Sequence, residues 1–412
     1  MNKSPRLVAL ETLYSIFYDG SYSNIALDKA LSDIKENKAF ISALVYGVTE
    51  RKITLDYFID KYAHGRIKPK VRIVLWLGAY QLLFMDKVPS SASINESVKL
   101  VKEIKQDYYS KLVNAVLHKI DNDRQIPDDL SVKYSVPENL INMWKKQYGE
   151  DVLNEFLPCI NDKPPLFAIP NKKFVNSDEL LYELECDGIL GEAYDEFVLI
   201  ENANDLTDSK AFKNGLFYIE DLSSFNCANA LDALADDLVL DMCSAPGGKA
   251  FTISQSMNNS GKIYCYDLHE HRLNLIKNSA KRLSIDNIYT DVNDATVYNE
   301  NIPKADKILC DVPCSGFGII RRKPEIRYKD LDSVKDLPQI QYKILETSSR
   351  YLKDGGRIIY STCTLNKKEN ENVVNKFLKD HFGYKLLKDK TVFPSTVGGD
   401  GFYYAIMVKN EN

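Results

Sequence analysis

Two cysteines lie in short motifs of small and polar residues, Asp311-Val-Pro-Cys-Ser-Gly316 and Ser361-Thr-Cys-Thr364. Each motif follows an apolar run typical of a buried strand, which places Cys314 and Cys363 on turns. A thiol on a turn beside a ligand is a candidate nucleophile, because nearby cations or a helix N-terminus favour the thiolate. The alternative for any single cysteine is a buried apolar residue without chemistry.

A glycine-containing turn, Asp241-Met-Cys-Ser-Ala-Pro-Gly-Gly-Lys249, follows an earlier strand-like run. Gly247 and Gly248 let the main chain approach a ligand closely, and the helix predicted to follow offers free N–H groups. The turn matches neither the dinucleotide fingerprint nor the phosphate loop of nucleotide hydrolases. It therefore indicates a different nucleoside ligand.

Two carboxylates follow the next two predicted strands, Asp267 and Asp294. The first can accept hydrogen bonds from ribose hydroxyls, and the second from an adenine amino group. A ligand with adenosine and a charged amino-acid tail suits this set, and S-adenosylmethionine has both. Lys249 is expected to pair with its carboxylate.

A methyl donor and a thiolate in one crevice predict methylation of carbon 5 of cytosine. Addition of the thiolate to carbon 6 builds electron density at carbon 5, which can then attack the sulfonium methyl group. Asp311, if protonated in the complex, can stabilise the charge that develops at ring nitrogen 3. A second thiol can assist release of the base. These arguments leave open which cysteine attacks.

Strands must bring these motifs together, and the order of the elements after residue 221 fits that need. Short apolar runs alternate with helical patterns, which favours an open, mostly parallel sheet with helices on both faces. Ligands bind such a sheet at the carboxyl ends of its strands. The predicted strands are 238–242, 262–267, 288–292, 307–310, 356–361 and 402–408, with a helix at 270–283.

The sequence upstream predicts two further domains. Residues 1–120 show helical periodicity throughout, and Val71–Met85 is apolar nearly all round, as the central helix of a bundle would be. A polar linker at 121–129 leads to a small α+β region, in which Ser135–Glu138 looks like a capping box. We therefore predict a multidomain protein, with an all-α domain (1–125), a small α+β domain (126–218) and an α/β Rossmann-like domain (219–412).

Composition excludes several classes of protein. The chain has 412 residues, a net charge of −5, and eight cysteines without a C-x-x-C pair, so no metal site and no general nucleic-acid coat are expected. Its longest apolar run is too short for a membrane span, and the N-terminus lacks a secretion signal. We expect a cytoplasmic protein with no membrane contact. In the absence of coiled-coil heptads, we expect a monomer.

Taken together, the motifs resemble those of the RNA 5-methylcytosine methyltransferases over nearly the whole chain, and among them the bacterial enzymes that act on 16S ribosomal RNA. The pattern includes Arg321-Arg-Lys-Pro324 and Gly399–Ala405, and Phe40–Arg51 is similar to NusB-type RNA-binding domains. Two segments depart from the family pattern. Phe167–Asn171 lacks an expected arginine, and Ile219-Glu-Asp221 replaces Val-Gln-Asp.

The resemblance implies a role for each matching residue. Cys363 is the expected nucleophile and Cys314 the expected helper in product release, with Asp311 also catalytic. The expected binding positions for S-adenosylmethionine are Cys243, Ser244, Ala245, Pro246, Gly247, Gly248, Lys249, Asp267, Asp294 and Asp311.

Ribosomal RNA is the expected partner, bound through local basic patches. The cluster of Arg321, Arg322, Lys323 and Arg327 is expected to contact RNA phosphates because it follows the Asp311–Gly316 motif directly. A second basic cluster, Arg66, Lys68, Lys70 and Arg72, fits a solvated face better.

Three alternatives remain. The same chemistry on transfer RNA has identical motifs. A non-catalytic RNA-binding or transcription-related factor would leave two intact cysteine motifs without a purpose. A DNA methyltransferase would use Cys314 as its nucleophile and leave Cys363 unexplained.

Overall fold

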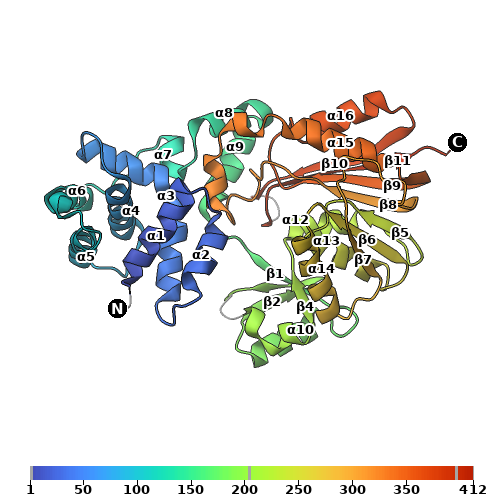
Figure 1. Ribbon diagram of the computed structural model, residues 1–412, viewed down its shortest axis with the longest axis horizontal. Coiled ribbons are helices and arrows are strands. Elements are labelled where there is room, and N and C mark those ends of the chain that lie inside the picture. The colour runs from blue at the N-terminus through green and yellow to red at the C-terminus, as the bar shows by residue number, and fades with distance from the viewer. Residues whose placement is uncertain (1–2, 203–205, 395–397, 412) are drawn as a thin grey trace. The chain divides into compact units, whose positions relative to one another are not determined.

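The computed structural model describes residues 3–202, 206–394 and 398–411 (Figure 1). The chain forms two compact units, one made of Met1–Asp162 with Ile320–Leu331 and the other of Lys163–Ile319 with Asp332–Asn412. The predicted boundaries near residues 125 and 218 do not coincide with this division. The helices at residues 130–156 belong to the first unit, and the strands and later helices of the predicted middle domain belong to the second.

The first unit is helical throughout its described residues, as predicted. Its centre is α4 (Pro69–Phe84), which carries apolar residues on nearly every side and packs against α1, α3, α5 and α6. Pro69 occupies the first turn of α4, where no main-chain N–H is needed. The other helices are α1 (Pro5–Tyr18), α2 (Ser23–Leu31), α3 (Lys38–Tyr62), α5 (Ser90–Glu103), α6 (Ser110–Asn122), α7 (Leu130–Tyr134), α8 (Glu138–Tyr148) and α9 (Glu150–Phe156), with 3-10 turns η1 (Asp107–Tyr109), η2 (Leu157–Asn161) and η4 (Pro324–Tyr328).

The capping box predicted at Ser135–Glu138 is wrong. Ser135 adopts a left-handed conformation after α7, and its hydroxyl accepts a hydrogen bond from the main-chain N–H of Ile53 at 2.9 Å. The residue before α8 is Pro137, which makes no side-chain cap. Because the Ser135 hydroxyl is bonded to Ile53 in α3, it does not cap the N-terminus of α8.

The second unit contains two sheets. The smaller sheet is antiparallel, in the order β2-β3-β1-β4. It consists of β1 (Leu166–Pro170), β2 (Gly191–Tyr194), β3 (Phe197–Ile200) and β4 (Phe217–Ile219), with α10 (Ser177–Cys186), η3 (Leu206–Asp208) and α11 (Lys210–Lys213). Asn176 and Glu179 form a reciprocal capping box that begins α10.

The larger sheet carries the predicted functional residues and has the order β10-β11-β9-β8-β5-β6-β7. The five strands from β9 to β7 are parallel, whereas β10 and β11 are antiparallel to their neighbours. The strands are β5 (Leu238–Asp241), β6 (Lys262–Asp267), β7 (Ile288–Val292), β8 (Ala305–Asp311), β9 (Leu352–Thr362), β10 (Tyr384–Val392) and β11 (Phe402–Lys409). The predicted parallel sheet is confirmed, with β10 as an additional edge strand.

Helices cover both faces of this sheet (Figure 1). Successive residues of a strand point to opposite faces, so Val239 joins one apolar core and Leu240 the other. The first core includes residues of α12 (Leu222–Asn229), α13 (Gly248–Ser256) and α14 (Glu270–Arg282), and the second those of α15 (Leu337–Ser349) and α16 (Glu371–Asp380). A short turn, η5 (Leu331–Val334), precedes α15. In the described ranges, no helix is long and apolar enough to cross a membrane.

Candidate active site

The two motif cysteines lie side by side at the carboxyl edge of the large sheet. Strands β8 and β9 are parallel neighbours and pair Asp311 with Ser361 at their ends. The loop after each strand therefore begins at the same level, and the Sγ atoms of Cys314 and Cys363 lie 3.4 Å apart. Both side chains are partly exposed. The prediction that both cysteines follow strands at one edge is confirmed.

Close main-chain contacts fix the two loops to each other. The N–H of Gly318 donates to the carbonyl of Cys363 at 3.0 Å, and the N–H of Gly401 donates to the carbonyl of Gly318 at 2.9 Å. A Cβ at Gly318 would lie 1.9 Å from the carbonyl oxygen of Gly401, so only glycine fits there. This contact explains the glycine two residues after the Asp311–Gly316 motif.

The two thiols influence each other's charge. The contact with the Cys363 thiol raises the pKa of Cys314 well above its ordinary value, and burial and the carboxylates of Glu369 and Asp311 act in the same direction. The pair therefore favours a state in which the two sulfurs do not both carry a negative charge. A protonated Cys314 can donate a hydrogen bond to the Cys363 sulfur, which sequence reasoning did not predict.

Asp311 is held from two sides at the end of β8. Its Oδ2 accepts from Lys249 Nζ at 2.7 Å, and its Oδ1 accepts from Ser361 Oγ at 2.9 Å. The Lys249 ammonium also lies 5.3 Å from the centre of the Phe402 ring. Burial alone would lower the pKa of Lys249, but Asp311 and Glu220 more than offset that effect and raise it. Lys249 thus stays charged beside Asp311.

A pocket of about 360 Å³ lies beside this ion pair. It contains most of the predicted cofactor loop together with both partners of the pair. Its lining includes Tyr218, Glu220, Asp221, Asp241, Cys243, Ser244, Ala245, Pro246, Gly248, Lys249, Phe251 and Asp311. Gly247 begins α13 with φ of 108°, a conformation that favours glycine.

The residues in this pocket fit the sulfonium and amino-acid end of S-adenosylmethionine. Within the described residues, both carboxylate oxygens of Asp241 and the hydroxyl of Ser244 are buried, and none of these atoms has a well-formed hydrogen bond. Burial raises the pKa of Asp241 to about 7, and weak interactions of its carboxylate with Ser244 and the Cys243 main chain only partly offset this effect. A buried carboxylate so weakly compensated is costly, and a bound cation would stabilise it.

The two predicted adenosine-binding carboxylates differ in their surroundings. Asp267 ends β6 and is nearly buried; it accepts from the N–H of His269 at 3.0 Å and pairs with Arg272, also at 3.0 Å. Asp294 follows β7 and is exposed, and its carboxylate accepts from Thr296. Both follow successive strands, as predicted, but neither is among the residues that line the pocket.

Arg327 is buried inside the helical unit, so the predicted contact between its side chain and RNA phosphates is wrong. It belongs to the first unit and is fully buried, where its guanidinium donates to the carbonyls of Glu50 at 2.9 Å and Ser135 at 3.2 Å. It also donates to the side chain of Asn161 at 2.9 Å. Arg327 therefore joins segments of the helical unit and is not available to a phosphate.

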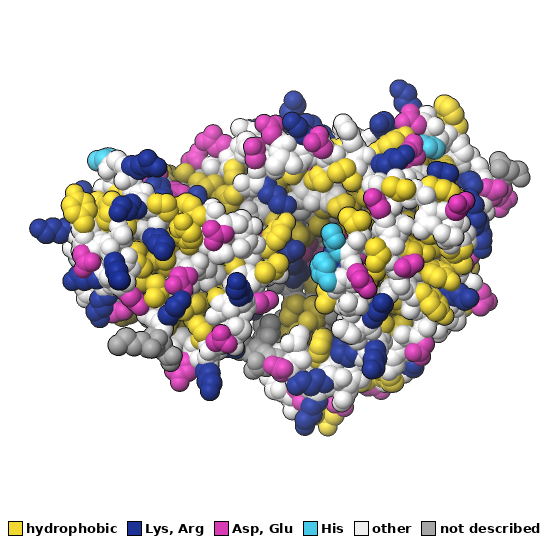
Figure 2. All heavy atoms as spheres, viewed as in Figure 1, with side chains coloured by type: hydrophobic (Ala, Val, Ile, Leu, Met, Phe, Trp, Pro, Cys, Tyr) yellow, Lys and Arg dark blue, Asp and Glu magenta, His cyan; other side chains and the backbone are white. Residues whose placement is uncertain are grey.

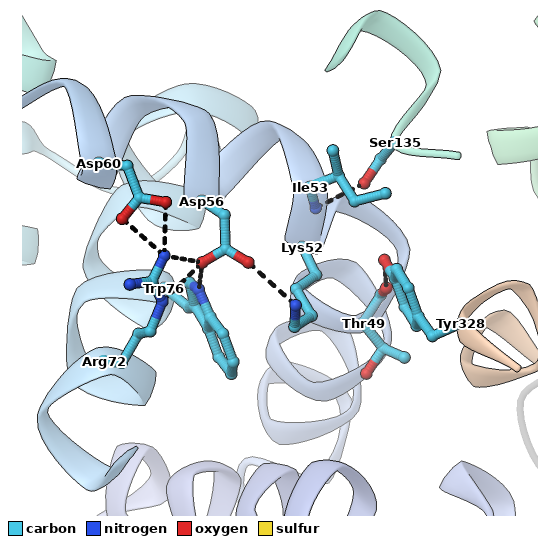
Figure 3. A network of polar contacts seen from close by, with 9 residues as sticks. All are labelled: Thr49, Lys52, Ile53, Asp56, Asp60, Arg72, Trp76, Ser135 and Tyr328. Carbon is cyan, nitrogen blue, oxygen red and sulfur yellow. Dashed lines mark hydrogen bonds and ion pairs between the residues drawn. The ribbon is translucent and has the colours of Figure 1, made fainter. Parts of the chain in front are cut away.

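Neighbouring residues of the same segment are also integrated into the helical unit. The Tyr328 hydroxyl donates to the carbonyl of Thr49 at 2.7 Å (Figure 3), and Ser23 donates to Glu325 at 2.6 Å. Arg321 is largely buried, whereas Arg322 and Lys323 are partly exposed. Of the four predicted RNA contacts, only these last two present surface.

In the other basic cluster, Arg72 has a structural role. Figure 3 shows its guanidinium between Asp56 and Asp60, with Trp76 Nε1 donating to the same Asp56 at 2.7 Å and Lys52 pairing with it at 2.9 Å. Arg66, Lys68 and Lys70 are exposed. On the face shown in Figure 2, basic and acidic side chains are interspersed, without a continuous basic surface.

Two buried carboxylates in this region were not predicted as site residues. Glu220 lines the pocket and accepts from Thr252 Oγ1 at 2.6 Å, and burial raises its pKa to about 7. Glu369 lies behind both cysteine loops. The sequence contained a sign of Glu220, because Ile219-Glu-Asp221 stands where the family usually has Val-Gln-Asp. Glu369 lies in a run of charged and amide residues, which is a pattern typical of exposed surface, so nothing in the local sequence indicates that it is buried.

The described residues contain no group of three or more His, Cys, Asp or Glu side chains arranged to hold a metal ion. The groups that the site presents are two thiols in contact, a carboxylate held by an ammonium group, and a pocket with a buried carboxylate.

Comparison with known proteins gives consistent matches along the chain. Residues 228–408 match the family of 16S rRNA methyltransferases RsmB/F, and residues 3–122 match the NusB family. A probable ribosomal RNA small subunit methyltransferase B from Bacillus subtilis is 33% identical, over 98% of this chain and 99% of its own. One with the same name from Synechocystis is 30% identical, over 92% and 90%. The crystal structure of PH0851 has a TM-score of 0.83 at 27% identity and covers 99% of this chain and 100% of its own.

Proposed function

The chain belongs to the RsmB/F family of 16S rRNA methyltransferases, and from this premise we propose that it methylates carbon 5 of a cytidine in 16S ribosomal RNA through a covalent bond between Cys363 and the base. It is an S-adenosylmethionine-dependent enzyme. The observation that carries the mechanism is the 3.4 Å pair of thiols, adjacent to the Lys249–Asp311 ion pair.

S-adenosylmethionine, when bound, supplies an electrophilic methyl group. The loop from Cys243 to Gly248 would bind its amino-acid end, with Asp241 compensating its positive charge. Asp267 and Asp294 would bind the ribose and the adenine. The buried and weakly compensated carboxylate of Asp241 supports this arrangement.

The position of Cys363 in Ser361–Thr364, the motif that resembles the family's nucleophile motif, supports Cys363 as the nucleophile. Its sulfur forms a bond to carbon 6 of cytosine, and the 5,6 double bond supplies the electron pair with which carbon 5 takes the methyl group. Asp311 takes up a proton from water when the base binds, shares it with ring nitrogen 3 as negative charge builds on the ring, and returns it to water on release, while Lys249 holds Asp311 in place.

Release completes the cycle. The carbon-5 proton leaves to water, its bonding pair restores the 5,6 double bond, and the carbon 6–sulfur pair returns to Cys363 as a thiolate. Cys314 donates a hydrogen bond to this leaving sulfur. Because such a bond stabilises the free thiolate relative to the adduct, it favours release of the methylated base.

The family places the reaction on small-subunit ribosomal RNA, and we further propose that the protein acts in the cytoplasm as a monomer. A thiolate reaches carbon 6 only when the base is unstacked, so an exposed or flipped cytidine is the expected target. The NusB-type region supports RNA binding by the first unit. Transfer RNA is the principal alternative substrate.

The test is methyl transfer from labelled S-adenosylmethionine to unmodified 16S ribosomal RNA, with transfer RNA in parallel and digestion to nucleosides. Labelled 5-methylcytidine from the ribosomal RNA supports the proposal. Label confined to transfer RNA would overturn the substrate, and cofactor binding without transfer to any RNA, including protein-bound ribosomal RNA, would favour the binding-factor alternative.

A further inference from the structure

One carboxylate, that of Glu369, lies behind the two cysteine loops and is fully buried. Its Oε1 accepts from Ser315 Oγ at 2.6 Å and from Asn366 Nδ2 at 2.9 Å. Its Oε2 accepts from the main-chain N–H of Ser315 at 2.8 Å and from Gln341 Nε2 at 3.0 Å. All four contacts are donated to the carboxylate, an arrangement that suits an acceptor-only group.

These contacts fix the Cys314 loop on both sides of the cysteine. Ser315, which follows Cys314, gives Glu369 both its main-chain N–H and its hydroxyl. Gln341, which donates to Glu369, also donates to the carbonyl of Pro313 at 3.0 Å, and Pro313 precedes Cys314. The position of the Cys314 thiol thus depends directly on this carboxylate.

Glu369 itself lies on the loop that follows Cys363, where Asn366 donates to it directly, and a further link to this loop passes through Thr364. The hydroxyls of Ser315 and Thr364 lie 2.7 Å apart. A serine hydroxyl has one proton, and Ser315 donates it to Glu369, so Thr364 is the donor in this pair. The Thr364 hydroxyl in turn accepts from the N–H of Phe317 at 3.2 Å. A single chain of hydrogen bonds therefore runs from Thr364 through Ser315 to Glu369.

We propose that Glu369 is a positioning residue that holds the Cys314 thiol beside Cys363 and thereby controls release of the covalent intermediate more than its formation. The inference rests on the proposed function, because it concerns the step after methyl transfer. Its ground is that Glu369 lies on the loop that follows Cys363 and bonds directly to Ser315, while Gln341 links it to Pro313 on the other side of Cys314. Among the described residues no hydrogen bond joins Glu369 to either thiol, so it takes no part in bond making and acts on Cys314 through the loop and through its charge.

The test uses Glu369→Gln in the full-length protein with 16S ribosomal RNA as substrate. A glutamine keeps the shape but turns one acceptor into a donor that faces other donors. We expect turnover to fall by about 10- to 100-fold, since small displacements of a reacting group have effects of this size. We also expect the fraction of protein in a denaturant-resistant adduct with RNA to rise, as it should for Cys314→Ala.

Glu371→Gln is the matched control. Glu371 lies two residues beyond Glu369, as the first residue of α16, and its carboxylate accepts from Thr391 at 3.3 Å, on strand β10 rather than on a cysteine loop. Its turnover and adduct fraction should equal those of the wild type. A comparable rise in adduct in this control would overturn the assignment to Glu369.

A purely structural role predicts a different pattern. In that case adduct formation and turnover would fall in parallel, in proportion to the loss of folded protein, and this result would overturn the proposal. Ser315→Ala covers the case in which Glu369→Gln does not fold, because it removes only the shared hydroxyl. It should also raise the adduct fraction, and wild-type behaviour of this variant would count against the proposal. Wild-type protein that makes no 5-methylcytidine, or a Cys363→Ala variant that still forms an adduct, would instead refute the proposed function itself.

Discussion

The Sγ atom of Cys314 lies 3.4 Å from that of Cys363, although 48 residues separate the two cysteines in the sequence. The in-register ends of two parallel strands bring them together. Each thiol is thus part of the other's environment, and replacing one of them changes the surroundings of the one that remains. This relationship leads to the first prediction.

Replacement of the two cysteines should have opposite effects on the covalent adduct. Cys363→Ala should abolish both turnover and adduct, because no sulfur remains to reach carbon 6. Cys314→Ala should lose turnover but accumulate adduct, because the leaving thiolate loses its hydrogen-bond donor. Denaturing electrophoresis with labelled RNA measures both. A Cys314→Ala protein that is inactive without any adduct would refute the release role.

Replacement of Lys249 distinguishes a catalytic role from cofactor binding. The structure pairs Lys249 with Asp311 at 2.7 Å, whereas pairing with the cofactor carboxylate was the expectation from sequence. We expect Lys249→Met to lower kcat by about 100-fold, the size typical for removal of one electrostatic interaction in a site. The Kd for S-adenosylmethionine, measured by calorimetry, should change little. A large rise in Kd with an unchanged kcat would instead favour pairing with the cofactor carboxylate.

Stability should decrease as the pH rises through neutrality, because of two buried carboxyl groups. Burial raises the pKa of Glu220 and of Asp241 to about 7, above the values of about 4 in the unfolded chain. Between these values the folded state holds protons that the unfolded state releases, so the contribution of these groups is greatest below about pH 4 and is lost as the pH passes 7.

Urea unfolding at about pH 5.5, 6.5 and 7.5 measures this effect. The wild type should lose on the order of 1–3 kcal/mol more over this range than the Glu220→Gln, Asp241→Asn double variant. Equal pH dependence of the two proteins would contradict the prediction.

Arg327 should matter for stability of the helical unit. Arg327→Met removes the buried donor to the carbonyls of Glu50 and Ser135 and to the Asn161 side chain, which should lower the free energy of unfolding by about 3 kcal/mol. Arg66→Met, an exposed position in the same unit, is the control and should change little. Thermal unfolding, monitored by circular dichroism, gives the melting temperatures of the two variants. Equal melting temperatures would show that the buried guanidinium contributes nothing.

Arg322 and Lys323 are the remaining candidates for phosphate binding in their cluster. Alanine at each position should weaken RNA binding and reduce the slope of log K against log salt by about 0.7 to 1 for each phosphate interaction removed. Filter binding over a series of salt concentrations gives the slope. An unchanged slope in both variants would place the RNA elsewhere, with Arg66, Lys68 and Lys70 as the next positions to test.

The parallel sheet and the order of its motifs were predictable from sequence, because apolar runs ending in Asp241, Asp267 and Asp311 identify strands by local pattern alone. The burial of Glu369 was not predictable. Its partners come from residues 315, 341 and 366, and only the folded chain brings them together. Arg327 was misassigned for the same reason, since its acceptors are main-chain carbonyls that the sequence does not distinguish.

The Ile320–Leu331 segment has a consequence for how such a protein can evolve. It is encoded within the catalytic sequence but supplies part of the interior of the helical unit, including Arg327. If only the N-terminal coding region were exchanged, the new helical unit would lack the matching Ile320–Leu331 segment that completes its interior. The two units are therefore not interchangeable modules, and a successful recombination must carry both stretches of sequence or preserve their match residue by residue.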